Sequence, residues 1–153
     1  VTAAAFSPDE RTVFLGGAPT SGGRWLLESV DLASGDPVAF DTTFAADTAG
    51  PIGMAMDPAG GQLVVAVNAG AAGRVQLRVY DASTLALLAT LDPPADAPAC
   101  GGCWIAPTVV DMPTRRAYVL IGGDSFSDRH PRIYSFDMLP PPGAGTTAPA
   151  GRR

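Results

Sequence analysis

The sequence contains no lysine, one histidine and two cysteines among its 153 residues. All ten basic residues are arginines, the net charge is −5, and arginines adjoin only at Arg115-Arg116 and Arg152-Arg153. Binding to a phosphate backbone needs a concentrated basic surface, so this distribution argues against a nucleic-acid partner. The single histidine excludes a metal site built on a histidine pair. We expect no transmembrane segment, because the chain lacks a run of about 18 apolar residues.

Glycine and proline, in contrast, are abundant. The chain has 18 glycines and 15 prolines, and 46% of its residues are hydrophobic. The hydrophobic content is that of a globular protein, while the glycines and prolines are too many for a helical bundle and follow no collagen period. Short strands joined by frequent turns account for this composition best.

The chain carries three copies of one pattern, each a polar turn followed by a short β-rich stretch. The copies are residues 6–17 (FSPDERTVFLGG), 56–70 (MDPAGGQLVVAVNAG) and 110–123 (VDMPTRRAYVLIGG). An aspartate that ends a further apolar stretch repeats in step, at Asp31, Asp81 and Asp137. The first two copies lie 50 residues apart by both landmarks, and the third follows after 54 or 56 residues. Two landmarks with matching spacing indicate a structural repeat.

The pattern predicts four short strands in each copy, except that no credible fourth strand follows Asp137 in the third copy. In the second copy these are residues 52–56, 63–67, 75–80 and 85–91, and residues 75–80 alternate between apolar and polar positions as a half-buried strand does. Four antiparallel strands every 50 residues or so are typical of a β-propeller blade. A β-sandwich with coincidental spacing is the alternative.

We therefore predict an all-β fold: a β-propeller segment of about three four-stranded antiparallel blades, forming a partial or open propeller. The blades are expected at about residues 1–45, 46–93 and 94–138. Residues 139–153, rich in proline and glycine, are expected to form a C-terminal linker or tail.

The stretches SPDERTVFL…VDLASGDPVA, MDPAGGQLVVAV…VYDASTLALLATL and VDMPTRRAYVLI resemble the YVTN-type propeller repeat of surface-layer and related extracytoplasmic bacterial proteins. The resemblance spans about residues 3–138 and implies an extracytoplasmic location. The chain begins at Val1 without a signal-like start, so we expect a removed signal peptide or a piece of a longer protein. Gly16-Gly17 and Gly122-Gly123 are closer to kelch-type blades, which are the second choice.

Three blades do not close a ring, for which about four to eight are usual. Two ways of completing the ring are considered. The chain is part of a larger propeller, which is the preferred interpretation, or two copies assemble into a six-bladed homodimer.

In an up-and-down blade, the second-to-third-strand loops share a face with the connections between blades, and binding sites favour such long loops. Cys100 and Cys103 lie in one of these connections, in PACGGCW. A local disulfide is the preferred interpretation, with metal binding and redox chemistry as alternatives. Trp104 follows directly, where haem attachment would need histidine, and is a candidate ligand contact.

The loop GGDSFSDRHPR supplies the other candidate ligand-binding residues: Asp124, Ser125, Asp128, Arg129 and His130. The first three offer oxygen ligands of the kind calcium prefers, although their spacing does not match an EF-hand. No cofactor is expected apart from this calcium candidate. The alternative is a solvated loop whose charges pair with each other.

The repeated aspartates are interpreted as structural, each accepting N–H bonds in the turn that follows its strand. No nucleophile motif is present. The favoured function is therefore a non-catalytic module that binds or scaffolds a protein or carbohydrate. The alternative is part of a propeller enzyme, of the lactonase or quinoprotein dehydrogenase type, whose site is completed by missing blades.

Overall fold

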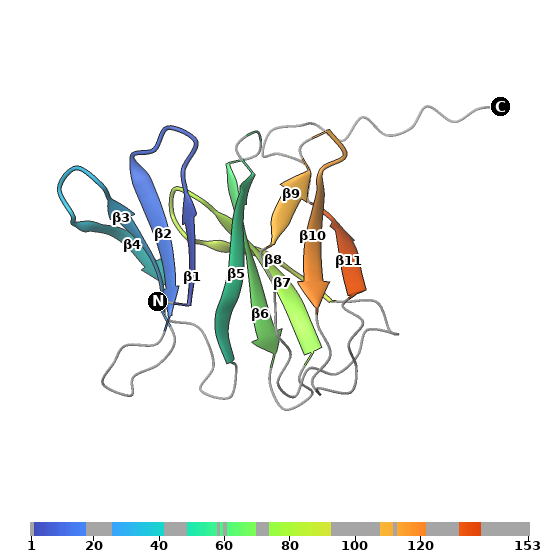
Figure 1. Cartoon of the computed structure of the whole chain (residues 1–153). Helices are drawn as coiled ribbons and strands as arrows, with labels where there is room; N and C mark the ends of the chain where they lie inside the picture. The colour runs from blue at the N-terminus through green and yellow to red at the C-terminus, as the bar shows by residue number, and fades with distance from the viewer. Residues whose placement is uncertain are drawn as a thin grey trace.

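The computed structural model describes residues 2–17, 26–41, 49–57, 59, 61–69, 74–92, 108–111, 113–121 and 132–138 (Figure 1). These residues form three antiparallel sheets and their turns. The first sheet contains β1 (Ala3–Phe6), β2 (Thr12–Gly17), β3 (Leu26–Asp31) and β4 (Pro37–Asp41); the second contains β5 (Ala49–Asp57), β6 (Gln62–Ala69), β7 (Arg74–Asp81) and β8 (Leu87–Leu91); the third contains β9 (Val109–Asp111), β10 (Arg116–Ile121) and β11 (Arg132–Asp137). Within this part of the chain, no helix is long and apolar enough to cross a membrane.

Each sheet is a meander in which every strand pairs with the next strand along the chain. The three sheets stand side by side, and the first strand of the second sheet, β5, contacts the first strands of both neighbours, β1 and β9 (Figure 1). Meanders stacked around their innermost strands form a β-propeller segment. The predicted fold class is thereby confirmed.

The repeat seen in the sequence is also a repeat of backbone contacts. In each sheet the residue after the third strand donates its N–H to a carbonyl oxygen in the turn between the first two strands. These pairs are Leu32 to Arg11 at 2.8 Å, Ala82 to Gly61 at 2.9 Å and Met138 to Arg115 at 2.9 Å. The strand registers match as well, since the pairs Phe6–Val13, Met56–Leu63 and Val110–Ala117 occupy the same position in successive sheets. Equivalent residues can therefore be assigned from structure.

The second sheet is buried on both faces. All five residues of β6 from Leu63 to Val67 have no exposed surface. Because side chains of a strand alternate between faces, Leu63, Val65 and Val67 pack toward the first sheet, and Val64 and Ala66 toward the third. Each contact between neighbouring sheets, here called the first and second junction, thus has its own hydrophobic core.

The first junction brings β2 of the first sheet very close to β5 of the second sheet. Phe14 and Leu27 of the first sheet pack with Tyr80 of the second. Gly16 lies against Pro51 so closely that a Cβ on Gly16 would be 2.6 Å from the Pro51 Cβ. The hydroxyl of Thr2 also donates a hydrogen bond to the Pro51 carbonyl oxygen. The glycine that gives residues 16–17 a kelch-like appearance is thus required by packing.

The second junction combines an apolar core with a buried ion pair. Val79 of the second sheet packs with Val119 and Phe136 of the third. At the end of β5, the Asp57 carboxylate, whose side chain is 1% exposed, lies 2.8 Å from the guanidinium of Arg115 in the β9–β10 turn. A charge this buried is stable only when paired, so the pair ties the two sheets together.

One boundary of the predicted strands is wrong. The fourth strand of the second copy was expected to start at Leu85, but β8 starts at Leu87. Leu85 has a φ of 55°, the conformation that its counterpart Gly35 (φ 77°) also adopts, and its side chain is buried in the first junction. The third sheet has three described strands where four are typical, and the residues after Met138 lie outside the described part.

Candidate functional site

The meanders place alternate strand ends on opposite sides of the molecule. One side, here called the connection face, is where β2, β4, β6, β8 and β10 end, at Gly17, Asp41, Ala69, Leu91 and Ile121. The other side, the turn face, carries the short turns such as residues 7–11 and 32–36. Figure 1 shows the strand ends of all three sheets in this common orientation. The predicted sharing of one face by the inter-strand and inter-blade connections therefore follows from the described strand ends.

The candidate residues themselves lie outside the described residues. They are Cys100, Cys103, Trp104, Asp124, Ser125, Asp128, Arg129 and His130. The structure defines where their segments begin and end. Residues 122–131 span Ile121 and Arg132, which are paired across β10 and β11. Residues 93–107 run from the end of β8 to Thr108, whose side chain is 4% exposed. Both segments therefore begin and end at the connection face, at the second and third sheets.

A polar cluster that sequence reasoning missed lies at the first junction. Asp41, which ends β4, is buried and lies close to Tyr80 of β7, and Arg78 of the same strand also lies close to Tyr80. Burial raises the pKa of the Tyr80 hydroxyl to about 12; the nearby Asp41 carboxylate also raises it, and Arg78 opposes the shift. Tyr80 is therefore neutral at physiological pH. No spacing signal marks this cluster, because its members come from different copies of the repeat.

The described residues of the innermost strands include few charged or reactive side chains. β1 reads AAAF, β5 reads AGPIGMAMD and β9 reads VVD. Propeller enzymes draw catalytic groups from several blades around the axis, whereas here the only charged residues on these strands are Asp57 and Asp111, at their turn-face ends. In the described part of the chain, no three histidine, cysteine or acidic side chains come together in a way that could hold a metal ion.

Two of the three repeated aspartates, Asp31 and Asp81, have the structural role that was predicted for all three. Asp31 Oδ1 accepts the N–H groups of Ala33 (2.9 Å) and Ser34 (2.8 Å). Asp81 Oδ1 accepts those of Ser83 (2.9 Å) and Thr84 (3.0 Å).

Hydrogen bonds explain the acidity of both groups. Those from the Ser34 and Ala33 backbone lower the pKa of Asp31, and those from the Ser83 and Thr84 side chains and backbone lower the pKa of Asp81. Asp137 differs, because its carboxylate pairs with the Arg116 guanidinium at 2.8 Å.

Comparison with known proteins supports the fold. No protein-family model and no curated protein sequence matches the chain. Among solved structures, it is similar to Sqt1 of Chaetomium thermophilum, a WD40-type β-propeller solved bound to the N-terminus of the ribosomal protein L10. The TM-score is 0.53 at 17% identity, over 86% of this chain. The match covers only 33% of the Sqt1 chain, so this chain corresponds to about a third of that propeller's length.

The fold and the face that it presents define the class of protein. The chain is a β-propeller segment of three stacked sheets. The strand ends that the inter-strand and inter-blade connections join lie on one side of it. At 17% identity the similarity to Sqt1 establishes the architecture alone, and does not separate YVTN-type, kelch-type and WD-type repeats.

Proposed function

We propose that this chain is a non-catalytic propeller module that binds a protein segment on its connection face. The observation that carries the proposal is the arrangement of the strand ends. A rigid scaffold with two hydrophobic junctions fixes them on one side, where adjoining segments can form a composite surface. The described residues of the inner strands β1, β5 and β9 contain no nucleophile–base pair and no metal cluster, so we assign them no catalytic role.

The kind of ligand follows from two considerations. Sqt1, which shares this architecture, was solved with a peptide-like ligand, the N-terminus of another protein. The candidates Trp104, Arg129 and His130 include the residue types, tryptophan and arginine, that supply most of the energy at protein interfaces. A carbohydrate is the second ligand class, because the same residue types also stack on and hydrogen-bond to sugars.

The origin that we propose for the module is an extracytoplasmic YVTN-type propeller, in which this chain supplies three of the sheets. The residues SPDERTVFL and VYDASTLALLATL carry this assignment. We also propose that Cys100 and Cys103 form a disulfide, which an extracytoplasmic setting allows.

The test uses a phage-displayed peptide library selected against the full chain, with binders measured by calorimetry. Trp104→Ala and the double variant Arg129→Ala/His130→Ala are expected to weaken the selected peptides by about tenfold or more, as for interface anchors. The matched control, Asp36→Ala, lies in an exposed turn on the opposite face and should leave binding unchanged.

Two results would overturn the proposal. One is a selection that yields no binder while a glycan array gives specific ligands, which would assign the face to carbohydrate. The other is a set of peptides that respond to the turn-face variant and not to Trp104→Ala or the Arg129/His130 variant.

A further inference from the structure

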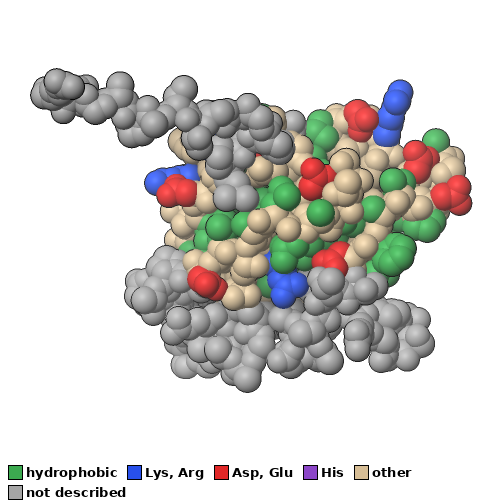
Figure 2. Space-filling view, turned by 180° about the vertical axis from the view of Figure 1, so that it is seen from behind, with side chains coloured by type: hydrophobic (Ala, Val, Ile, Leu, Met, Phe, Trp, Pro, Cys, Tyr) green, Lys and Arg blue, Asp and Glu red, His purple; other side chains and the backbone are tan. Residues whose placement is uncertain are grey.

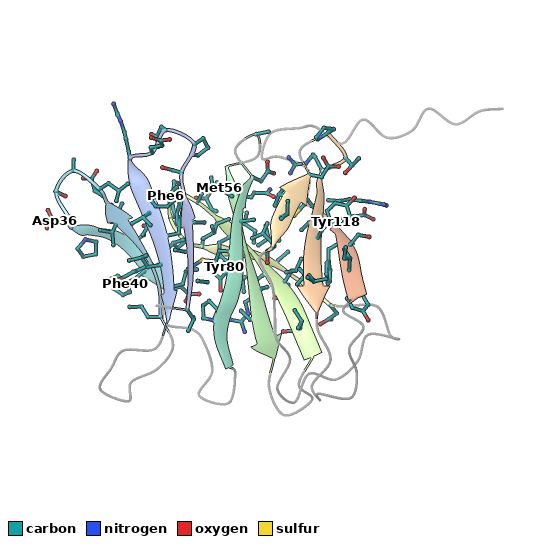
Figure 3. The ribbon with its side chains drawn as sticks, viewed as in Figure 1. Phe6, Asp36, Phe40, Met56, Tyr80 and Tyr118 are labelled. Atoms are coloured by element: carbon teal, nitrogen blue, oxygen red, sulfur yellow. The ribbon has the colours of Figure 1, made fainter. Side chains whose placement is uncertain are left out.

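Among the described residues, each of the two outer sheets exposes one hydrophobic face. On the first sheet, Phe6, Val38 and Phe40 have 60%, 61% and 69% of their surface exposed. On the third sheet, Val109 and Ile133 are 57% and 69% exposed. Figure 3 shows Phe6 and Phe40 on the first sheet and Tyr118 on the third, and Figure 2 shows hydrophobic side chains reaching the surface over the first sheet, at the right of that view.

The equivalent positions in the other sheets are covered by a neighbouring sheet. Phe6 corresponds to Val110, and Leu32 corresponds to Met138; both Val110 and Met138 pack into the second junction. On the first sheet the same positions line a shallow hollow of about 530 Å³, together with Ser7, Pro8 and Glu10. The hollow therefore lies where the repeat elsewhere seats the preceding sheet.

The residues equivalent to the ion pair of the second junction indicate which sheet fits against the hollow on the first sheet. Asp57 follows Met56, and Asp111 follows Val110, so the two aspartates are equivalent. Arg115 and Arg11 are equivalent because each carbonyl oxygen accepts the same backbone bond. At the first junction these positions hold Ser7 and Gly61, which cannot form an ion pair. The two remaining members of the ion-pair pattern, Arg11 and Asp111, lie on the two sides that the described residues leave uncovered, and the Asp111 carboxylate accepts a hydrogen bond from the Thr114 hydroxyl in its own turn.

From this match we infer that the uncovered side of the first sheet docks onto the uncovered side of the third sheet of a second copy of this chain. Arg11 then pairs with Asp111 across the contact, as Arg115 pairs with Asp57 within the chain. Within the described residues, neither Arg11 nor Asp111 forms an ion pair. Arg11 is exposed and Asp111 half-buried.

The contact is heterologous, because two different faces meet, and such contacts close only when the rotation completes a ring. Propellers close with about four to eight blades. Two copies of the three described sheets give six sheets, which lies within that range. The expected assembly is therefore a closed dimer with two identical junctions, each containing one Arg11–Asp111 pair.

The decisive experiment is charge reversal of the full chain, read by light scattering after size exclusion. The wild type is expected at about twice 15.6 kDa. Arg11→Asp alone and Asp111→Arg alone should each raise the dimer dissociation constant by about tenfold or more, because like charges then meet at both junctions. An equimolar mixture of the two variants should recover the dimer, since opposite charges are restored at both junctions of the mixed pair.

Two further variants separate this contact from a loss of folding. Phe6→Ser should weaken the dimer, whereas Leu88→Ser, at a 43% exposed residue on the outer strand of the second sheet, should not. Circular dichroism should show unchanged β-structure in every variant.

A wild-type mass of 15.6 kDa throughout the micromolar range would overturn the inference, and the completing blades would then be sought in a longer chain. A dimer indifferent to both charge reversals, or one that the mixture does not restore, would also overturn it. None of these results bears on peptide binding at the connection face, which its own variants test.

Discussion

Gly16→Ala tests the packing of the first junction at its closest point. The added Cβ would lie 2.6 Å from the Pro51 Cβ, 2.9 Å from the Pro51 Cγ and 3.1 Å from the Met54 Cε. The proline ring belongs to the inner strand β5 and cannot move without it, so the two sheets must separate. Overpacking of this kind costs about 1–3 kcal/mol. Replacing a strand glycine by alanine returns about 0.5–1 kcal/mol.

The midpoints of these two ranges leave an expected net loss of about 1 kcal/mol of unfolding free energy, which corresponds to a fall in Tm of about 2–4 °C for a chain of this size. Urea unfolding followed by circular dichroism measures the first quantity, and a thermal scan the second. In a Pro51→Gly background the clashing ring atoms are gone, so the same substitution should cost less. The positive coupling between positions 16 and 51 is the specific signature of contact.

Gly35→Ala serves as the control. No atom lies within 4 Å of the Cβ that it would add, but its φ of 77° strains any other residue. Its cost should therefore be the same with Pro51 or with glycine at position 51. The packing explanation would be refuted by a Gly16→Ala protein as stable as the wild type, or by a cost that Pro51→Gly does not reduce.

Three further predictions concern other features. Arg115→Met should lower the unfolding free energy by about 3–5 kcal/mol, because it leaves the buried Asp57 carboxylate without its guanidinium; a urea titration that shows under 1 kcal/mol would speak against the buried pair. Asp81→Asn should lower the urea midpoint at neutral pH and make little difference in strong acid. The lowered pKa of Asp81 means that its stabilisation is present above the ordinary value of 3.8 and is lost as pH falls through the lower folded value; a gap that stays constant with pH would contradict this. A thiol assay on unreduced protein should find Cys100 and Cys103 blocked, and two reactive thiols would exclude the disulfide.

The repeat made the fold predictable, because spacing and alternation carry the information that a stacked meander needs. The positions of β2, β6 and β10 follow from their β-rich stretches, and the face shared by the connections follows from counting strands. Leu85 was misplaced for a physical reason. Its apolar side chain suggested a strand, whereas it fills the first junction from a left-handed turn position.

Contacts between sheets could not be predicted from one sequence. The pair of Asp57 with Arg115 and the cluster around Asp41 join different copies of the repeat, and their formation depends on how neighbouring sheets are rotated and spaced. The candidate site was predictable only as a face. The strand ends that bracket residues 93–107 and 122–131 are common to the repeat, but the chemistry of these segments is particular to each one.

Hydrogen–deuterium exchange of the full chain, with and without a selected peptide, tests the central claim most directly. The account predicts slowed exchange at the connection face, in peptides that cover residues 93–107 and 122–131 and the strand ends at Gly17 and Ala69. Exchange in the turns at residues 7–11 and 32–36 should not change. Protection confined to those turns would contradict a binding site on the connection face.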